Sequence, residues 1–203
     1  SGQLQRETIA FIMVPAWVRD VRSDLKKAIE MDYPNKEPMQ CPFITHWLNQ
    51  MQDDRVMNYI GYAGFTNAKD EKLKIIFIPC YLDGKDGILN KPYYDILIGM
   101  DATVYPSYYE PWGYTPLESV AFHVPTITTS LAGFGLWAAE QKMDALAPVQ
   151  VLRRTDSNYD EVVNGIAESL FCFAQYSIEQ IENMRKGAAA IAKKAEWKHF
   201  FKY

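Results

Sequence analysis

The sequence contains few histidines and cysteines and has no long apolar run. Three of the 203 residues are histidines and three are cysteines. Cys41, Cys80 and Cys172 are odd in number and far apart, which argues against a disulfide framework and against a paired metal-ligand motif. We expect reduced, mostly buried thiols. The apolar stretches are too short and too interrupted to cross a bilayer. These features predict a cytoplasmic chain without a membrane partner.

A continuous stripe of basic side chains is also missing. The chain has 21 Lys and Arg residues against 25 Asp and Glu residues, which gives a formal net charge of −4. Its basic residues are scattered as short pairs, so they do not form a track for a polyphosphate backbone. Nucleic acid is therefore not an expected partner. The 48% hydrophobic and 23% charged residues are typical of a globular protein.

Short β-branched and apolar runs alternate with helical patterns along most of the chain. The predicted strands lie at 9–14, 73–79, 102–106, 125–130 and 148–152, and the predicted helices at 18–31, 44–52, 93–99, 115–123, 134–142, 159–175 and 178–195. The strands lack polar alternation, so both of their faces should be covered. Strands separated by helices predict the α/β class, with a Rossmann-like parallel sheet flanked by helices. We expect one domain over 3–203 with a helical C-terminal segment, and interpret Ser1-Gly2 as the scar of a cleaved tag.

The segment 105–119, YPSYYEPWGYTPLES, concentrates aromatic, proline and glutamate residues. It follows a predicted strand and leads into a helix that should begin near 113–116. In an open parallel sheet, ligands bind beyond the carboxyl ends of the strands, and the free amides of a helix N-terminus favour anions. The segment therefore predicts a site for an anionic ligand such as a phosphate.

The two glutamates of this segment have different local settings. Thr115, Pro116 and Glu118 fit a capping box with proline at the first helical position, which would explain Glu118 without a ligand. Glu110 lies in the loop before the helix. A carboxylate at that position can reach whatever the helix N-terminus binds.

The stretch PSYYEPWGYTPLE resembles the signature of eukaryotic-type glycogen synthases, glycosyltransferase family 3. Further similar pieces follow in the same order: AFIMVPA, PFITHWL, KIIFIPCYL, YYDILIGMD, VPTITTSLAGFG and AEWKHF. The resemblance covers most of the chain and corresponds to the C-terminal, nucleotide-sugar-binding half of a two-domain GT-B enzyme. It implies transfer of glucose from UDP- or ADP-glucose to the non-reducing end of an α-1,4-glucan, with retention of configuration and without a cofactor or metal ion.

The resemblance also assigns roles to individual residues. Glu110 matches the catalytic glutamate beside the donor sugar, and Glu118 matches the acceptor of ribose hydroxyl hydrogen bonds. Tyr93 matches the residue that stacks on the nucleobase, although an aromatic side chain packed in the core is an equal alternative. Four further residues would line the sugar and the pyrophosphate, partly through backbone amides: Trp112, Gly113, Tyr114 and Thr115.

The chain also departs from the family pattern. The Gly-Arg segment and the lysines that clamp the donor phosphates in the family have no counterpart here, and neither has the half that binds the α-glucan acceptor. The chain alone is therefore expected to be inactive. Two alternatives stay open: a GT-B transferase with a different donor, and a sugar-nucleotide-binding module without catalysis.

Three smaller expectations concern the surroundings of the site. The AGFG sequence at 132–135 forms either a turn near the donor phosphate or a simple connection to the next helix. His46 and His123 are expected to be structural. Four aromatic residues should form an exposed patch at the cleft: Tyr108, Tyr109, Trp112 and Tyr114.

Overall fold

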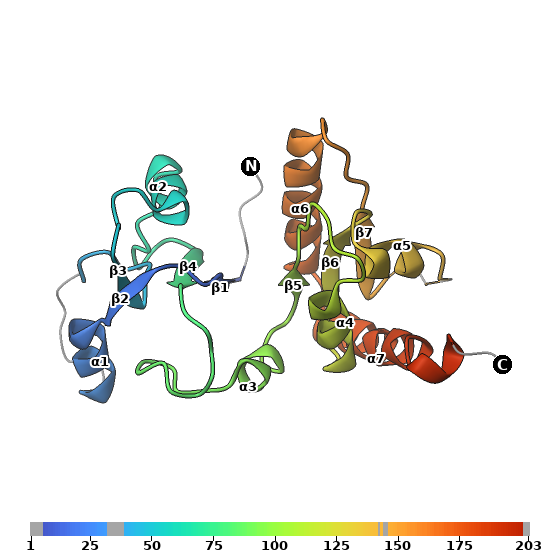
Figure 1. The fold of residues 1–203 in the computed structure, drawn as a ribbon, viewed down its shortest axis with the longest axis horizontal. Coiled ribbons are helices and arrows are strands. Elements are labelled where there is room, and N and C mark those ends of the chain that lie inside the picture. The colour runs from blue at the N-terminus through green and yellow to red at the C-terminus, as the bar shows by residue number, and fades with distance from the viewer. Residues whose placement is uncertain (1–5, 32–38, 142, 144–145, 201–203) are drawn as a thin grey trace. The chain divides into compact units, whose positions relative to one another are not determined.

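The computed structural model describes residues 6–31, 39–141, 143 and 146–200 (Figure 1). The chain divides into two compact units, Ser1–Tyr93 and Tyr94–Tyr203. The expectation of one domain over 3–203 stays a prediction. The Ser1-Gly2 scar lies outside the described residues.

The first unit combines parallel and antiparallel strand pairs. β1 (Thr8–Met13) pairs in parallel with β4 (Leu73–Ile78), and β2 (Val18–Val21) pairs antiparallel with β3 (His46–Leu48). Two helices, α1 (Ser23–Glu30) and α2 (Arg55–Tyr62), complete the unit. Its core consists of two apolar clusters built around Phe43, Ile60 and Ile75 and around Ile44, Leu48 and Phe77.

The predicted helix 44–52 was wrong, and the predicted helix 18–31 was confirmed only over α1, because contacts from elsewhere in the chain decide the local structure. Residues 18–21 of the predicted helix 18–31 form β2, and 46–48 of the predicted helix 44–52 form its partner β3. Arg22, only 1% exposed, separates β2 from α1. Its guanidinium donates hydrogen bonds to the carbonyl oxygens of Gln40 at 2.8 Å and Cys41 at 2.6 Å. Apolar spacing within 18–31 does not reveal these partners.

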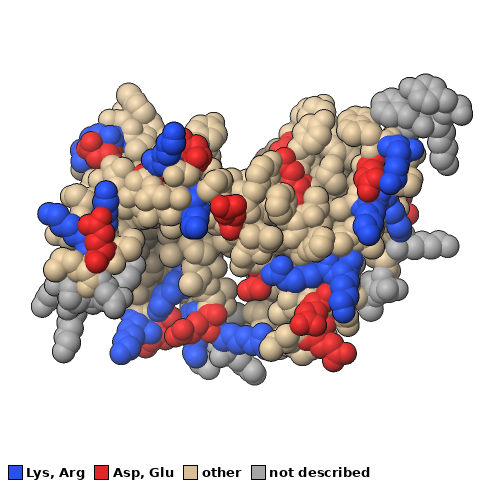
Figure 2. All heavy atoms as spheres, turned by 90° about the horizontal axis from the view of Figure 1, so that it is seen from below, with Lys and Arg blue, Asp and Glu red and all other residues tan. Residues whose placement is uncertain are grey.

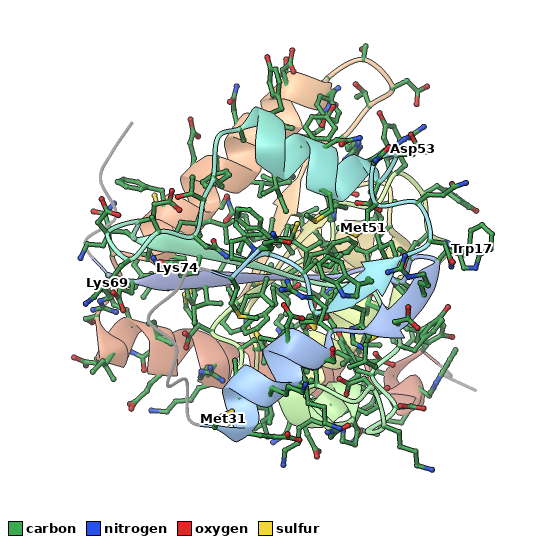
Figure 3. The ribbon with its side chains drawn as sticks, turned by 90° about the vertical axis from the view of Figure 1, so that its left-hand side faces the viewer. Trp17, Met31, Met51, Asp53, Lys69 and Lys74 are labelled. Carbon is green, nitrogen blue, oxygen red and sulfur yellow. The ribbon has the colours of Figure 1, made fainter. Side chains whose placement is uncertain are left out.

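The first unit also exposes a large aromatic side chain beside a shallow hollow. Trp17 is 72% exposed and projects outward in Figure 3. Together with Leu48, Gln50 and Asp53 it lines a pocket of about 150 Å³. No residue of the segment 105–119 contributes to this pocket.

The second unit is built on a three-stranded parallel sheet. Its strands β5 (Thr103–Val104), β6 (Thr126–Thr129) and β7 (Val149–Leu152) lie in chain order. They are connected by α4 (Tyr114–Ala121) and α5 (Gly133–Ala139). The chain ends in α6 (Tyr159–Phe173), α7 (Ile178–Lys194) and the 3₁₀ turn η1 (Trp197–His199). This arrangement confirms an α/β protein with parallel strands flanked by helices.

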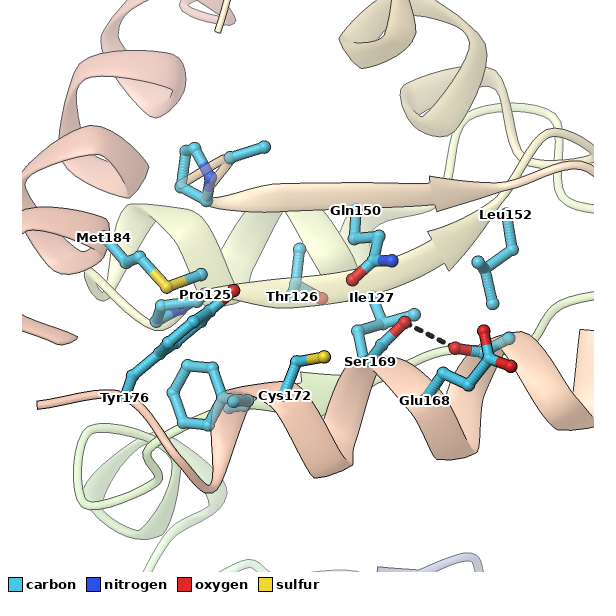
Figure 4. Close-up of a pocket in the computed structure, with 15 residues that line it drawn as sticks. Pro125, Thr126, Ile127, Gln150, Leu152, Glu168, Ser169, Cys172, Tyr176 and Met184 are labelled. Atoms are coloured by element: carbon cyan, nitrogen blue, oxygen red, sulfur yellow. Dashed lines mark hydrogen bonds between the residues drawn. The ribbon is translucent and has the colours of Figure 1, made fainter. Parts of the chain in front are cut away.

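In the second unit, α4, α5 and α7 pack into a common apolar core with β7, whereas a cavity lies between the sheet and α6. The main core joins α4, α5, β7 and α7 through Val120, Phe134, Val149 and Ile191. Between the strands and α6 lies a cavity of about 490 Å³, across which Thr126 and Gln150 face Ser169 and Cys172 (Figure 4). None of the residues predicted to bind the donor lines this cavity.

Helix α4 ends in a Schellman motif, which gives His123 a backbone role. The amide of His123 donates to the carbonyl of Val120, and the amide of Val124 donates to that of Ser119. His123 adopts a left-handed conformation with φ of 62°, as expected at the position after a helix C-cap.

The surface chemistry agrees only partly with the sequence reading. Figure 2 shows acidic and basic side chains interspersed on the face in view. All three cysteines are free thiols, but Cys41 and Cys172 are exposed, so the prediction of mostly buried thiols was wrong. Cys41 lies in a loop and Cys172 faces the cavity beside α6. Within the described part of the chain, no helix has both the length and the apolar character that a bilayer span requires.

Candidate functional site

The loop that follows β5 is tied to the chain segment after β6. The Thr129 hydroxyl donates to the carbonyl of Ser107 at 2.7 Å, and the amide of Glu110 donates to the carbonyl of Leu131 at 3.2 Å. The amide of Gly133 in turn donates to the carbonyl of Glu110 at 3.2 Å. The backbone of Glu110 is thus fixed at the carboxyl ends of two neighbouring parallel strands, where ligands of open α/β sheets bind.

The carboxylate of Glu110 lies next to the start of α4. The Ser107 hydroxyl donates to Glu110 Oε1 at 3.3 Å. Gly113, the N-cap of α4, has a φ of 94°, and a Cβ added there would lie 3.3 Å from Glu110 Oε2. A side chain at Gly113 would therefore strain the backbone and crowd the carboxylate. Glycine at this buried position avoids that crowding.

The predicted capping box is wrong. Helix α4 begins at Tyr114, its N-cap is Gly113, and no side chain caps it. Pro116 is therefore the third helical residue, where its missing N–H still costs no hydrogen bond. Glu118 lies too far along the helix to reach the N-cap amide, and its Oε1 accepts a hydrogen bond from the Tyr94 hydroxyl at 3.0 Å.

Tyr94 is a neighbour of Glu118 that sequence reasoning missed. The hydrogen bond to Glu118 and the negative charge of that carboxylate raise the pKa of the Tyr94 hydroxyl. The Tyr94 ring stacks on Phe122 with centroids 5.0 Å apart. The family resemblance assigns a role to Tyr93 only, and the adjacent Tyr94 was the available sequence signal for this contact.

Tyr93 belongs to the first unit, at the start of α3 (Tyr93–Leu97). Its amide donates to the carbonyl of Leu82 at 2.9 Å. Its role as a nucleobase-stacking residue stays a prediction.

Three of the four aromatic side chains expected to be exposed are exposed. Tyr108, Tyr109 and Tyr114 are 54%, 76% and 60% exposed. Trp112 instead turns inward and contacts a cluster of rings formed by Phe134, Trp137 and Phe200. The Trp112 indole therefore anchors the site loop to this cluster of rings and does not contribute to an exposed surface with the three tyrosines.

The AGFG segment connects β6 to α5 and packs against the site loop. The amide of Phe134 donates to the carbonyl of Trp112 at 2.6 Å, and the amide of Gly133 to that of Glu110. A Cβ at Gly133 would lie 2.3 Å from the carbonyl oxygen of Pro111. Glycine at 133 is thus required for the loop and α5 to approach each other, and the first amides of α5 are already used.

Arg154 is a second residue of the site region that sequence reasoning missed. It follows β7, is 6% exposed, and its Nη1 donates to the carbonyl of Pro106 at 3.0 Å. Its guanidinium carbon lies 3.7 Å from the centre of the Tyr108 ring. The Arg153-Arg154 pair directly after a predicted strand was the available signal.

Among the described residues of the first unit, one cluster combines side chains that can bind a metal ion, but two of its three members are already hydrogen-bonded. One donor atom each of His46, Cys80 and Asp86 lie within 4.8 Å of one another. The two ring nitrogens of His46 are hydrogen-bonded, to the Thr45 hydroxyl and to the Asp86 carbonyl, each at 2.8 Å. The Asp86 carboxylate accepts the amides of 88–90. The cluster supports the loop, in line with the structural role expected of His46.

The second unit is thus an α/β unit whose parallel strands carry the Glu110 carboxylate beyond their carboxyl ends. Comparison with known proteins then shows the family. The glycogen synthase family model matches residues 20–203. Among similar proteins, glycogen (starch) synthase of Neurospora crassa is 32% identical over 158 residues, 77% of this chain and 22% of the relative. The liver enzyme of Rattus norvegicus is 28% identical over 186 residues, 91% of this chain and 26% of the relative. Glycogen (starch) synthase isoform 1 of Saccharomyces cerevisiae is 31% identical over 160 residues, 77% of this chain and 23% of the relative.

The chain belongs to the glycogen synthase family. It spans about a quarter of the length of the relatives that it matches.

Proposed function

We propose that this chain is the donor-binding part of a retaining glucosyltransferase that elongates an α-1,4-glucan from UDP- or ADP-glucose. The observation that carries the proposal is the Glu110 carboxylate, fixed at the carboxyl ends of parallel strands beside the first turn of α4. The relatives named above, all glycogen (starch) synthases, support it. The proposal includes the Rossmann-like fold and its place as the C-terminal domain of a GT-B enzyme.

The start of α4 is the proposed diphosphate site. The first amides of a helix have no partner within it, and the helix dipole favours negative charge at this end. Pro116 removes one of these donors, which leaves the amides of Gly113, Tyr114 and Thr115. Gly113 has no side chain, so a phosphate can approach these amides closely. The leaving diphosphate is thereby stabilised by backbone groups of this chain.

Glu110 is the proposed catalytic residue. Its carboxylate accepts hydrogen bonds from hydroxyl groups of the bound glucosyl ring and offsets the positive charge that develops on that ring as the bond to the diphosphate breaks. The acceptor hydroxyl attacks from the face that the diphosphate leaves, so the configuration at the anomeric carbon is retained. The Ser107 hydroxyl holds one carboxylate oxygen, and the other lies toward Gly113.

Glu118 and the aromatic residues complete the donor site. The Tyr94 hydroxyl donates to one oxygen of Glu118, and the second oxygen is the proposed acceptor for ribose hydroxyls. Tyr93 is proposed to stack on the nucleobase. Trp112 contributes through its backbone, because its indole packs inward against Phe134.

Two experiments test this function. Titration calorimetry of the chain with UDP and ADP should show weak binding to the helix site, and Gly113→Ala should abolish the heat. Absence of heat with either nucleotide at millimolar concentration, in a folded sample, contradicts the diphosphate site. In the full-length protein, glucose from UDP- or ADP-glucose should enter a glucan in α-linkage. A β-linked product would contradict retention, and binding without transfer would support a non-catalytic module.

A further inference from the structure

Arg154 is a buried cation without a carboxylate partner in the part of the chain that the structure describes. It is 6% exposed, and its Nε is buried without a hydrogen-bond partner among those residues. The described ion pairs involve Arg19, Arg22, Arg185 and Lys198, not Arg154. Burying a charge without a counter-charge is costly, so packing alone would favour an apolar side chain at this position.

The side chain of Arg154 reaches the first residues of the site loop. Nη1 donates to the carbonyl of Pro106 at 3.0 Å, and the guanidinium carbon lies 3.7 Å from the centre of the Tyr108 ring. The backbone of Arg154 is itself anchored, because its amide donates to the Ser130 hydroxyl at 3.0 Å. Arg154 thus links the ends of β6 and β7 to a loop 48 residues earlier in the chain.

The residue between the two contacts of Arg154 is the one that holds Glu110. Ser107 lies between Pro106 and Tyr108, and its hydroxyl donates to Glu110 Oε1 at 3.3 Å. Its carbonyl accepts the Thr129 hydroxyl at 2.7 Å. Any shift of 106 or 108 therefore moves the hydroxyl that orients the carboxylate.

We propose that Arg154 is a positioning residue for Glu110: its guanidinium clamps Pro106 and Tyr108, and thereby fixes the Ser107 hydroxyl that orients the carboxylate. The inference rests on the proposed role of Glu110 in glucosyl transfer. Arg154 itself touches neither the donor nor the reacting atoms in this account. Burial of the Arg154 charge is unfavourable for stability, and its proposed benefit is the orientation of the catalytic Glu110.

Lysine cannot replace arginine in this role. The guanidinium is planar, so it can stack on a ring and donate sideways at the same time, whereas an ammonium group on a flexible stem has no fixed plane. Arg154→Lys keeps the charge and loses the clamp. Arg153 offers a matched control, because it is the exposed neighbour in the same pair.

The test compares Arg154→Lys with Arg153→Lys in the full-length protein. A misplacement of about 1 Å can lower a rate roughly 100-fold, so Arg154→Lys should lower kcat by about 10- to 100-fold. The KM for the nucleotide sugar should change little, because Arg154 does not contact the donor. Hydrogen exchange of the amides of 107–110 should become faster. Arg153→Lys should change neither kcat nor the hydrogen exchange of these amides.

A second variant separates positioning from a purely structural role. Arg154→Met removes the buried charge and keeps an unbranched stem, so the melting temperature should stay equal or rise while kcat still falls. A parallel fall of melting temperature and kcat would overturn the proposal, as would a wild-type kcat in Arg154→Lys. If the unsubstituted protein transfers no glucose, the proposed function fails, and hydrogen exchange of the amides of 107–110 in both variants still decides whether Arg154 clamps the loop.

Discussion

Replacing Gly133 with alanine should break the contact between the site loop and α5. The added Cβ would lie 2.3 Å from the carbonyl oxygen of Pro111, and that oxygen belongs to the backbone and cannot turn aside. The loop or the helix must move. The hydrogen bonds from the amides of Gly133 and Phe134 to the carbonyls of Glu110 and Trp112 would then lengthen or break.

The magnitude follows from these two effects. Overpacking of a filled site costs about 1–3 kcal/mol. Loss of two hydrogen bonds costs about 0.5–1.5 kcal/mol each. Gly133→Ala should therefore lower the free energy of unfolding of the second unit by about 2–6 kcal/mol. Because the displaced segment carries Glu110, nucleotide binding at the start of α4 should weaken as well.

Urea denaturation followed by tryptophan fluorescence and circular dichroism measures the change. Gly61→Ala is the control: Gly61 lies in α2, and a Cβ there meets no atom within 4 Å. That substitution should stabilise the first unit by about 0.4–1 kcal/mol. Equal unfolding midpoints for Gly133→Ala and the unsubstituted chain would refute the close-approach argument.

Two further predictions concern titrating groups. Hydrogen bonding to Glu118 raises the pKa of Tyr94 above its usual 10.0, so its contribution to stability is present below pH 10 and lost as the pH rises through the folded-state value. In NMR of tyrosine labelled with ¹³C, Tyr94 should titrate above pH 10.0, and Glu118→Gln should lower its pKa. An unchanged pKa in Glu118→Gln would contradict the hydrogen bond. Burial, with the charges of two nearby aspartates, raises the pKa of Cys80 to about 11. At pH 8, iodoacetamide should therefore label the exposed Cys41 and Cys172 before Cys80 in peptide mass spectrometry, and faster labelling of Cys80 would be inconsistent with this environment.

Sequence patterns predicted five of the seven strands in the described part of the chain, because these five are short apolar runs that can be recognised without their partners. They missed β2 and β3, which pair with each other. The runs at 73–79 and 125–130 became β4 and β6 with little change in their bounds. The predicted helix 18–31 formed only over 23–30, because Arg22 and the pairing of β2 with β3 depend on residues 18 or more positions away. Local periodicity carries no information about such partners.

The location of the candidate site could be predicted from the sequence, but the contacts that hold the site loop in place could not. The strand, the loop and the following helix placed Glu110 beside a helix N-terminus, and the structure shows that arrangement. The capping box failed because Gly113, with its left-handed φ, starts the helix before Thr115. Arg154 was not predictable as a neighbour of Pro106, since 48 residues separate the two.

The most direct test of the proposed function is the kinetics of Glu110→Gln in the full-length protein. The substitution keeps the shape of the side chain and removes its charge, and Ser107 can still donate to the remaining oxygen. Glu140→Gln, an exposed residue after α5, is the matched control. Removing one electrostatic group aimed at the transition state lowers kcat by roughly 10²- to 10³-fold, so Glu110→Gln should do the same with an unchanged melting temperature. Wild-type turnover in Glu110→Gln would contradict the assignment of Glu110 as the catalytic carboxylate.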